Sequence, residues 1–428
     1  MANYQDLADM SPVLKNVYLP VRKDAFQAMT PLLAAARRGS ADSVRYAGND
    51  LFFDIIVGKR GGMIASRVGN LPESQNAPER QGRLGISRVY FTVEVDGLNA
   101  RATEDSKGSF ISASKKLVAD VMKQWKIEQE RILHGDGRAV RAVIIAKTSD
   151  TVWTADSPYG ISGAGPGNLH LEPGDTCALL DASASFAVLG KGKVLTITRS
   201  GDTATITFDT DMDGGGTGAA GDLLVTATPT ATSATDTSFG AEPYGIDAIT
   251  DVAANFATFE GINHARWVAQ KLTSASVDET IVMKLLNTIR AKGGVEWRDD
   301  PKAMLLVTST GIWQSYGESL LGLRRFAAPE MTVNGGFTAT KVAGAALLDD
   351  PWCPRGRLYA IHTPDTLFVD LLDFGLTSLQ DAPRWQRSAT RDAYQAVFAS
   401  YWNYGATVRN THGVISGITD TVDYSPAT

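Results

Sequence analysis

The sequence has little of what stabilises small secreted domains or binds metals. Its 428 residues include two cysteines, Cys177 and Cys353, which lie far apart in the chain. Two distant cysteines cannot form a disulfide framework, so we expect a chain that works in a reducing compartment. The five histidines are scattered without metal-ligand spacing. We therefore expect no cofactor.

Long hydrophobic runs are also missing. No stretch of about 18 apolar residues occurs, which argues against a transmembrane helix, and we expect no membrane partner. The opening residues, MANYQDLADM, lack a basic stretch followed by an apolar core, so they do not resemble a secretion signal.

Catalytic motifs are the third absence. The chain contains no G-x-S-x-G, no H-E-x-x-H, no Walker loop and no Cys-x-x-Cys. The run GAGPG at 163–167 has the glycines of a nucleotide loop, but no helical pattern follows it. We expect no enzymatic activity.

Charge is unevenly distributed. The net charge is −6, yet residues 146–242 carry 4 basic and 12 acidic residues, a balance of −8. Three of these acidic residues, Asp209, Asp211 and Asp213, precede Gly214 at alternate positions, as in the first half of a calcium loop. The twelfth position is Ala220 instead of glutamate. An acidic hairpin tip is therefore favoured over a weak cation site.

A long polar excursion lies between two predicted strands, 51–57 and 88–95. Residues 59–88 contain paired glycines and few large apolar residues, so they cannot form a core of their own. We expect the two strands to flank an extended hairpin that projects from the subunit. The excursion has a balance of +4, with Glu73 and Glu79 against six basic residues: Lys59, Arg60, Arg67, Arg80, Arg83 and Arg88.

The clearest helix is predicted at 106–134, where apolar residues recur at helical spacing. Ser106 or Ser109 can cap its start, and Gly135 ends it. Its lysines form a basic exposed side: Lys115, Lys116, Lys123 and Lys126.

Further elements follow along the chain. Residues 146–242 are rich in Gly, Ser, Thr and Asp and have short apolar runs, which indicates a small all-β insertion. A second helix is predicted at 276–292, with Ser276 and Glu279 as a capping box. The other predicted elements are a short helix near 26–37, a helix at 310–321 and strands at 304–309, 358–362, 366–372 and within 390–418.

Five segments resemble one protein family. They are RILHGDG at 131–137, EPYGIDAITD at 242–251, FEGINHARW at 259–267, LLDDPWCPRGRLYAIHT at 347–363 and YWNYGATVRNTHGVISGI at 401–418. In this order, after a projecting hairpin and a long helix, they resemble the major capsid proteins of tailed bacteriophages. The resemblance covers nearly the whole chain, and the order of the segments is more specific than any one of them.

The resemblance implies an α+β shell fold, named after phage Hong Kong 97. We expect an N-terminal arm, an extended hairpin called the E-loop, a peripheral domain with a long spine helix, an axial domain and the β insertion. The expected ranges are 1–48 for the arm, 49–105 for the E-loop with its flanking strands, 106–145 for the spine helix and the start of the peripheral domain, 146–242 for the insertion, 243–276 for the return through the peripheral domain, 277–378 for the axial domain and 379–428 for the C-terminal strands.

The resemblance also implies a function. We expect a subunit that assembles with itself as pentamers and hexamers into the icosahedral head around double-stranded phage DNA, in the virion, after assembly in the cytoplasm of the bacterial host. Other expected partners are a portal and scaffolding or decoration proteins. The six basic hairpin residues would contact a neighbouring subunit, and the four helix lysines would face DNA without sequence specificity.

Two departures from the family pattern bear on assembly. Only about fifty residues precede the hairpin, so we expect no long scaffolding segment and a chain that stays uncleaved. Lys59 is the only lysine of residues 59–88 and lies near the hairpin base. We therefore do not expect the isopeptide crosslink that some relatives form.

Three alternatives stay open. An encapsulin-type bacterial compartment has the same fold, and its cargo would be an enzyme instead of DNA. A secreted β-rich binding or adhesive protein would fit the Thr-rich insertion but lacks a signal. An enzyme of unknown type would need a catalytic constellation, which the sequence does not offer.

Overall fold

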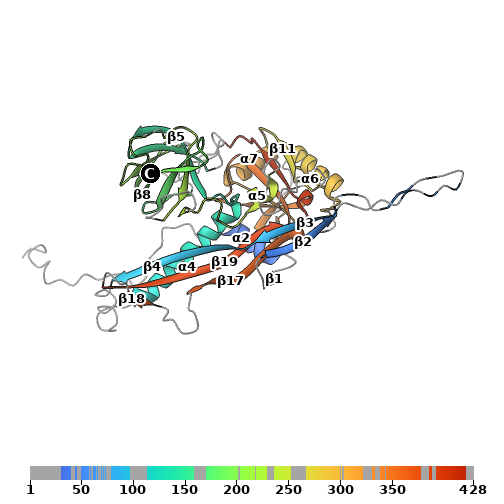
Figure 1. The fold of residues 1–428 in the computed structure, drawn as a ribbon. Coiled ribbons are helices and arrows are strands. Elements are labelled where there is room, and N and C mark those ends of the chain that lie inside the picture. Colours follow the sequence, from blue (N-terminus) through green and yellow to red (C-terminus); the bar gives the residue numbers. More distant parts are fainter. Residues whose placement is uncertain are drawn as a thin grey trace, which may run out of the picture.

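The structure, a computed structural model, describes most of the chain. The described residues are 30–39, 44–45, 50–56, 79–96, 113–158, 170–200, 203–216, 218–228, 236–251, 267–298, 300, 303–321, 330–332, 338–342, 344–376, 385–387 and 392–420, with single positions between 58 and 73. They form an α+β fold, as predicted: a long sheet, a second sheet with helices, a barrel and a two-stranded hairpin (Figure 1).

The long sheet forms the base of the molecule. Its central strand, β19 (Ala393–Ala406), pairs antiparallel with β17 (Thr366–Leu376) and, on its other side, with β4 (Ser87–Asp96). Two short strands, β1 (Val44–Arg45) and β18 (Gln386–Arg387), complete it.

Two helices cover one face of the long sheet. They are α2 (Pro31–Gly39) and α4 (Ala113–His134). Val121 and Trp125 of α4 pack against Phe398 and Trp402 of β19 in the largest described hydrophobic cluster. Burial of this apolar face, which recurs at helical spacing, fixes α4 on the sheet.

Helix α4 is the predicted long helix. Its 22 residues span about 33 Å at 1.5 Å per residue. The chain turns where predicted, and the Gly135 N–H donates to the Ile132 carbonyl. The proposed caps Ser106 and Ser109 lie outside the described residues.

The second sheet lies beside the barrel and contains seven described strands, in the order β11-β20-β16-β12-β15-β14-β13. Both faces are buried, because Leu305 and Val307 of β12 join the cluster shared with the long sheet while Met304 and Leu306 pack against α6 and α7. The strands are β11 (Gln270–Thr273), β12 (Met304–Thr308), β13 (Glu330–Thr332), β14 (Thr338–Val342), β15 (Ala345–Asp349), β16 (Arg357–His362) and β20 (Gly413–Ser416). The helical elements are α5 (Ile246–Thr250), α6 (Glu279–Gly293), α7 (Thr310–Leu321), η3 (Thr363–Asp365) and η4 (Arg409–Thr411).

The predicted cap of α6 is wrong. Asp278, not Ser276, precedes the first helical residue, and its carboxylate accepts from the Ile281 N–H. Ser276 instead forms a turn with Ser274. The predicted end is confirmed, since Gly294 adopts the left-handed conformation (φ 74°) that stops a helix.

The insertion is a closed six-stranded barrel in the order β10-β5-β6-β9-β8-β7. It begins at Val140, six residues before the expected range, because β5 follows α4 almost directly. The run GKGKV at 190–194 lies inside strand β8. The strands are β5 (Val140–Ser149), β6 (Val152–Asp156), β7 (Thr176–Asp181), β8 (Ala187–Ser200), β9 (Thr203–Phe208) and β10 (Leu223–Thr226).

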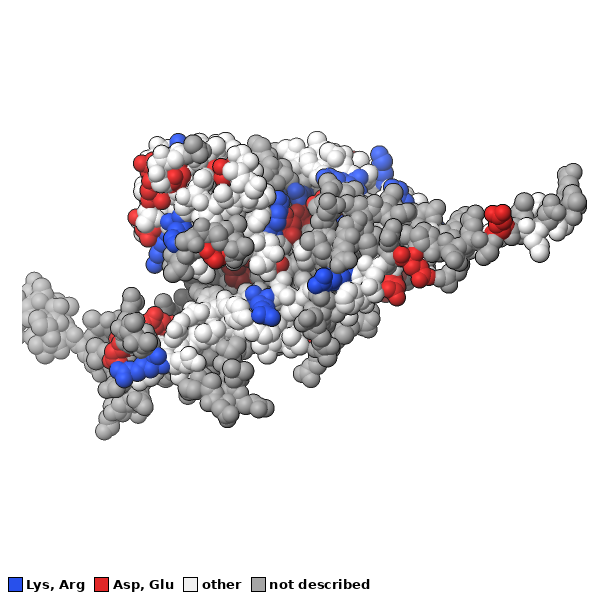
Figure 2. Space-filling model, viewed as in Figure 1, with Lys and Arg blue, Asp and Glu red and all other residues white. Residues whose placement is uncertain are grey.

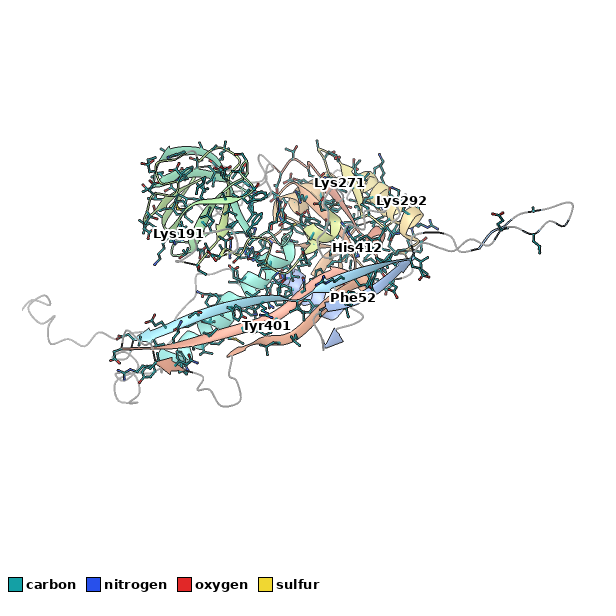
Figure 3. All side chains as sticks on the ribbon, viewed as in Figure 1. Phe52, Lys191, Lys271, Lys292, Tyr401 and His412 are labelled. Carbon is teal, nitrogen blue, oxygen red and sulfur yellow. The ribbon has the colours of Figure 1, made fainter. Side chains whose placement is uncertain are left out.

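The hairpin differs from its prediction in one respect. Strand β2 (Asp50–Ile56) pairs with a strand that the sequence did not predict, β3 (Glu79–Gly85), instead of with β4. One face of the pair packs on the body, where Ile55 contacts a cluster with Ala248 and Trp267. The opposite face exposes Phe52 at the hairpin base (Figure 3).

None of the helices in the described ranges combines the length and the apolar character needed to cross a membrane.

Candidate functional site

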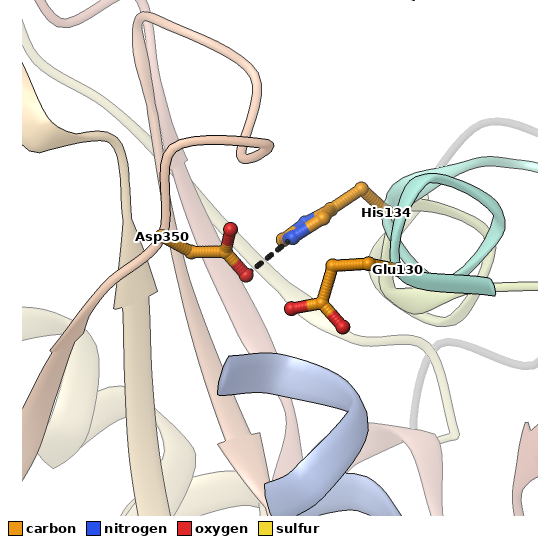
Figure 4. Close-up of side chains that lie close together, drawn as sticks. All are labelled: Glu130, His134 and Asp350. Atoms are coloured by element: carbon orange, nitrogen blue, oxygen red, sulfur yellow. Dashed lines mark hydrogen bonds and ion pairs between the residues drawn. The ribbon is translucent and has the colours of Figure 1, made fainter. Parts of the chain in front are cut away.

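Three buried side chains meet at the C-terminal turn of α4: Glu130, His134 and Asp350 (Figure 4). His134 Nε2 lies 2.9 Å from Asp350 Oδ2. The Glu130 carboxylate accepts from the N–H groups of Leu32 and Leu33, both at 2.7 Å. It therefore caps the N-terminus of α2, where the first N–H groups have no partner within the helix. We call these three residues the junction triad.

The triad carries less negative charge than two carboxylates would suggest. Burial and the neighbouring Asp350 carboxylate raise the pKa of Glu130 well above its usual range. Burial would also raise the pKa of Asp350, but the His134 imidazole lowers it below its usual value. Glu130 thus retains its proton more readily than Asp350 does. Two carboxyl groups and an imidazole are a metal-ligand set, but the backbone of α2 already uses both Glu130 oxygens.

A second ionic cluster joins α4 to the barrel. Arg141 of β5 donates to both carboxylate oxygens of Glu128, each at 3.0 Å, and Arg131 Nε donates to Glu128 Oε2 at 2.9 Å. Arg131 also pairs with Glu242, which follows the barrel. Burial alone would raise the pKa of Glu128, but Arg141 and Arg131 lower it below its usual range. These pairs hold the barrel against the helix.

A cavity of about 570 Å³ lies where β4, α4 and the barrel approach one another. Its wall includes Phe91, Trp125, Arg141, His170 and Trp352. The rings of His170 and Trp352 stack, with centroids 6.2 Å apart. Because burial and the neighbouring arginines lower the pKa of His170 well below its usual value, its imidazole is neutral. The cavity is thus lined by rings and paired charges.

Neither ionic cluster was identified from the sequence. Glu130 and His134 are four residues apart on one helix, which places them on the same side, and this spacing was an available signal. Their partner Asp350 lies 216 residues from His134, and no local pattern connects the two. His134, at the last position of the helix, faces the Asp350 carboxylate through its Nε2.

The candidate cation residues in the barrel already have partners. Lys147 Nζ lies 2.7 and 2.9 Å from the two oxygens of Asp213 and 2.9 Å from Asp150. Asp211 accepts from the Asp213 and Gly214 N–H groups, and Asp209 accepts from the Lys193 N–H. The ammonium group of Lys147 thus lies where a cation would balance these carboxylates.

The predicted inter-subunit residues are spread along the hairpin and the start of β4. Lys59, Arg60 and Arg67 lie outside the described residues. Arg80 is in β3, but its side chain is not among those described; Arg83 of β3 and Arg88 of β4 are exposed.

The predicted DNA-facing lysines all lie in α4. The side chains of Lys115 and Lys116 are outside the described ones. Lys123 and Lys126 are exposed on the side of the helix away from Val121 and Trp125, which pack on the sheet. These two form the predicted exposed basic side.

Comparisons with known proteins identify the fold. No family model matches the sequence, and no curated protein matches it. The capsid of cyanophage A-1(L) matches with a TM-score of 0.56 and 12% identity, over 96% of this chain and 98% of that one. The capsid of a native GTA particle matches with a TM-score of 0.50 and 9% identity, over 97% and 100%. This is the shell fold of tailed-phage capsid proteins. The holo-SrpI encapsulin from Synechococcus elongatus PCC 7942 is also similar, with a TM-score of 0.49 and 8% identity over the full length of both chains.

The two sheets cross the domain ranges expected from the sequence. The long sheet includes β17, which was expected in the axial range 277–378. The seven-stranded sheet includes β11 and β20, which were expected in the ranges 243–276 and 379–428. Helix α4 takes the place of the expected spine helix, and the barrel follows it. The junction triad connects α2, this spine helix and the seven-stranded sheet, which we call the axial sheet.

Proposed function

We propose that this protein is the major capsid protein of a tailed phage, which assembles as pentamers and hexamers into the icosahedral head around double-stranded DNA. The observation that carries the proposal is the capsid fold, which extends over 96% of the chain and 98% of the cyanophage subunit.

The distribution of charge supports head-to-tail association. The β2–β3 pair, at the base of the hairpin, lies at one end of the long sheet, and exposed acidic residues of β4, α4 and the turn before β19 lie toward the other end (Figure 1). We call these acidic residues the distal strip: Glu94, Asp96, Asp120 and Asp392. In the proposed ring, hairpin arginines of one subunit pair with carboxylates of the next through forked hydrogen bonds. Each exposed pair contributes about 0–1 kcal/mol, and a closed shell repeats it in every subunit.

The acidic charge of the barrel also supports one orientation of the subunit in the shell. The segment 146–242 has a balance of −8, and acidic side chains are visible on the barrel (Figure 2). Packaged DNA would repel such a domain, so we place the barrel on the outer surface. Lys123 and Lys126, with Lys115 and Lys116, would line the lumen together with the arm, whose residues 1–48 carry 6 basic and 4 acidic residues. These contacts would be with phosphates alone.

The proposed partners follow from this role. A closed head needs a portal for DNA, and scaffolding or decoration proteins would act during assembly or on the finished surface. The protein would function in the virion after assembly in the host cytoplasm.

Electron microscopy of the purified, expressed chain tests the proposal. We expect closed icosahedral particles, and particles from an infected lysate should contain double-stranded DNA. Particles that enclose a cargo enzyme and no DNA would identify an encapsulin-type compartment instead. A protein that stays monomeric at every concentration and ionic strength would contradict both.

A further inference from the structure

The cavity between the body and the barrel has the size and the lining of a small-molecule site. Its volume is about 570 Å³, and strand β4, helix α4 and the barrel with its adjoining segments all line it. Pockets that hold small molecules typically measure about 300–1,000 Å³ and combine apolar and aromatic side chains with a few polar groups. The cavity therefore has room for a small ring-containing molecule.

Four side chains of the body give the cavity an apolar wall. Val89 and Phe91 of β4 pack with Trp125 and Ile132 of α4 in the cluster between sheet and helix, and all four also line the cavity. Trp125 and Ile132 are almost completely buried. An apolar molecule that displaces water from this wall gains the free energy of hydrophobic burial.

The buried ionic groups of the lining are paired with one another. Arg141 donates to both oxygens of Glu128 and to the hydroxyl of Thr226, and Arg131 pairs with Glu128 and Glu242. A charged ligand would lose its hydration here without gaining an opposite charge, which is costly. The paired groups therefore favour an uncharged occupant.

Three further ionisable side chains line the cavity and do not change this preference. Arg88 and Glu172 are exposed, so water weakens their interaction with a ligand. Asp175 accepts from the backbone N–H of Glu172. Burial raises the pKa of both carboxyl groups, so they hold a proton more readily than ordinary carboxyl groups do.

Trp352 brings a ring and a donor to the lining. Its Nε1–H is buried and has no acceptor among the residues that the structure describes. Buried N–H groups are normally hydrogen-bonded, and an acceptor on a ligand would remove the cost of leaving this one unsatisfied. The Trp352 ring also stacks on the neutral imidazole of His170, with 13° between the two planes. These parallel rings favour a ligand that is itself a ring.

We propose that the cavity binds an uncharged, largely apolar, ring-containing molecule that carries a hydrogen-bond acceptor for Trp352 Nε1. Because the body lines one side of the cavity and the barrel the other, the bound molecule contacts both and stabilises their docked arrangement. The site lies within one subunit, so its binding is measured on the unassembled chain. A failure of the chain to form shells would leave this proposal standing.

Thermal unfolding of the full-length chain with quinoline as the probe tests the site. Quinoline has uncharged fused rings and a nitrogen that accepts a hydrogen bond. A ligand that binds only the folded state stabilises it, so we expect about millimolar quinoline to raise the melting temperature by about 1–2 °C. N-methylquinolinium has the same rings with a permanent positive charge and no acceptor, and it should produce no shift.

Variants that fill the cavity locate the binding. Ile127→Trp adds volume from α4, and Ala241→Phe adds volume from the segment that follows the barrel. Both should abolish the shift with quinoline. Ala241 is exposed, so this second variant keeps the test decisive if Ile127→Trp does not fold. Met122→Trp is the matched control and should keep the shift, because Met122 lies on the same helix, is 40% exposed and is not among the lining residues.

Trp352→Phe tests the hydrogen bond. It keeps a ring and removes the donor, so we expect quinoline to bind about 3- to 10-fold more weakly. Naphthalene has no acceptor, and its dissociation constant should change by less than about 2-fold in the same variant. Equal weakening of both probes would overturn the assigned role of Trp352. The absence of a shift with quinoline, an undiminished shift in Ala241→Phe, or an equal shift with N-methylquinolinium would overturn the proposed site.

Discussion

His134 and Asp350 form a fully buried pair, with Nε2 and Oδ2 2.9 Å apart and neither side chain exposed. His134 is the last residue of the spine helix, and Asp350 directly follows β15 of the axial sheet. Asp350 also accepts from the Trp352 N–H, so it orders the loop that lines the cavity. The pair thus fixes the angle between the spine helix and the axial domain.

Removing the carboxylate should destabilise the subunit strongly. We predict that Asp350→Ala lowers the free energy of unfolding by about 3 kcal/mol, because the buried imidazole and the loop N–H lose their acceptor. Asp392→Ala is the matched control, since Asp392 pairs with Arg387 on the surface, and it should cost less than about 1 kcal/mol. Denaturant unfolding of both variants measures the difference. Similar losses would contradict the structural role of the pair.

The raised pKa of Glu130 predicts a dependence on pH. The folded chain holds this proton more tightly than the unfolded chain, so the stabilisation is complete below the ordinary value of 4.5 and is lost as pH rises through the folded value. Glu130→Gln has no proton to lose. We therefore predict that the difference in unfolding free energy shifts in favour of Glu130→Gln between pH 5 and pH 9. Denaturant titrations at several pH values measure this shift, and a constant difference would refute it.

The parts of the fold that depend on local burial could be predicted from sequence. Helix α4 and strand β4 were found because their apolar residues recur with the period of the buried face, and strands β2 and β12 because each is a short apolar run. Strand β3, ERQGRLG, has no such pattern. It is a strand because β2 pairs with it along its length. The polar sequence of β3 alone does not show which segment will pair with it.

The site was harder to predict than the fold. Serine and aspartate are both good helix caps, so the sequence allows either Ser276 or Asp278 to cap α6. Which of them does so depends on the residue at which the backbone becomes helical. The contacts of the junction triad join residues that are far apart in the chain: Leu33 and Glu130 are 97 positions apart, and His134 and Asp350 are 216 positions apart. Such contacts follow from the tertiary arrangement alone, so a single sequence cannot reveal them.

Gly190 of β8 should tolerate no side chain. A Cβ there would lie 2.3 Å from the Met212 carbonyl oxygen, which belongs to backbone and cannot swing away. We predict that Gly190→Ala costs about 2 kcal/mol through overpacking. In Gly317→Ala the added methyl meets nothing within 4 Å and removes a glycine from helix α7, which should gain about 0.5–1 kcal/mol. Thermal unfolding of the two variants should shift in opposite directions.

The acidic turn of the barrel should not need calcium. Because Lys147 already lies against Asp213 and Asp150, we predict that a chelator leaves the melting temperature unchanged. Lys147→Met should lower it, since the buried Asp213 carboxylate loses its cation. A drop of several degrees with chelator in the unmodified protein would show that a bound cation is required.

Charge reversal in the hairpin should prevent shell closure. We predict that Arg80→Glu with Arg83→Glu reduces the yield of closed particles at least about 10-fold, because the hairpin would repel the distal strip of its neighbour. Adding Glu94→Arg, on that strip, should restore part of the yield. Sedimentation counts the particles. A normal yield in the double variant, or no rescue by Glu94→Arg, would rule out the proposed pairing.

The chain enters and leaves the barrel through two neighbouring strands. Its first strand, β5, pairs antiparallel with its last, β10, and Val140 lies opposite Val225. The two chain ends of the barrel are therefore adjacent, and the elements around it remain connected through a narrow gap. Such a module can be gained or lost in evolution by one insertion or deletion at one point of the chain. Proteins of this fold with and without the barrel can therefore be related by one insertion at a single point of the chain.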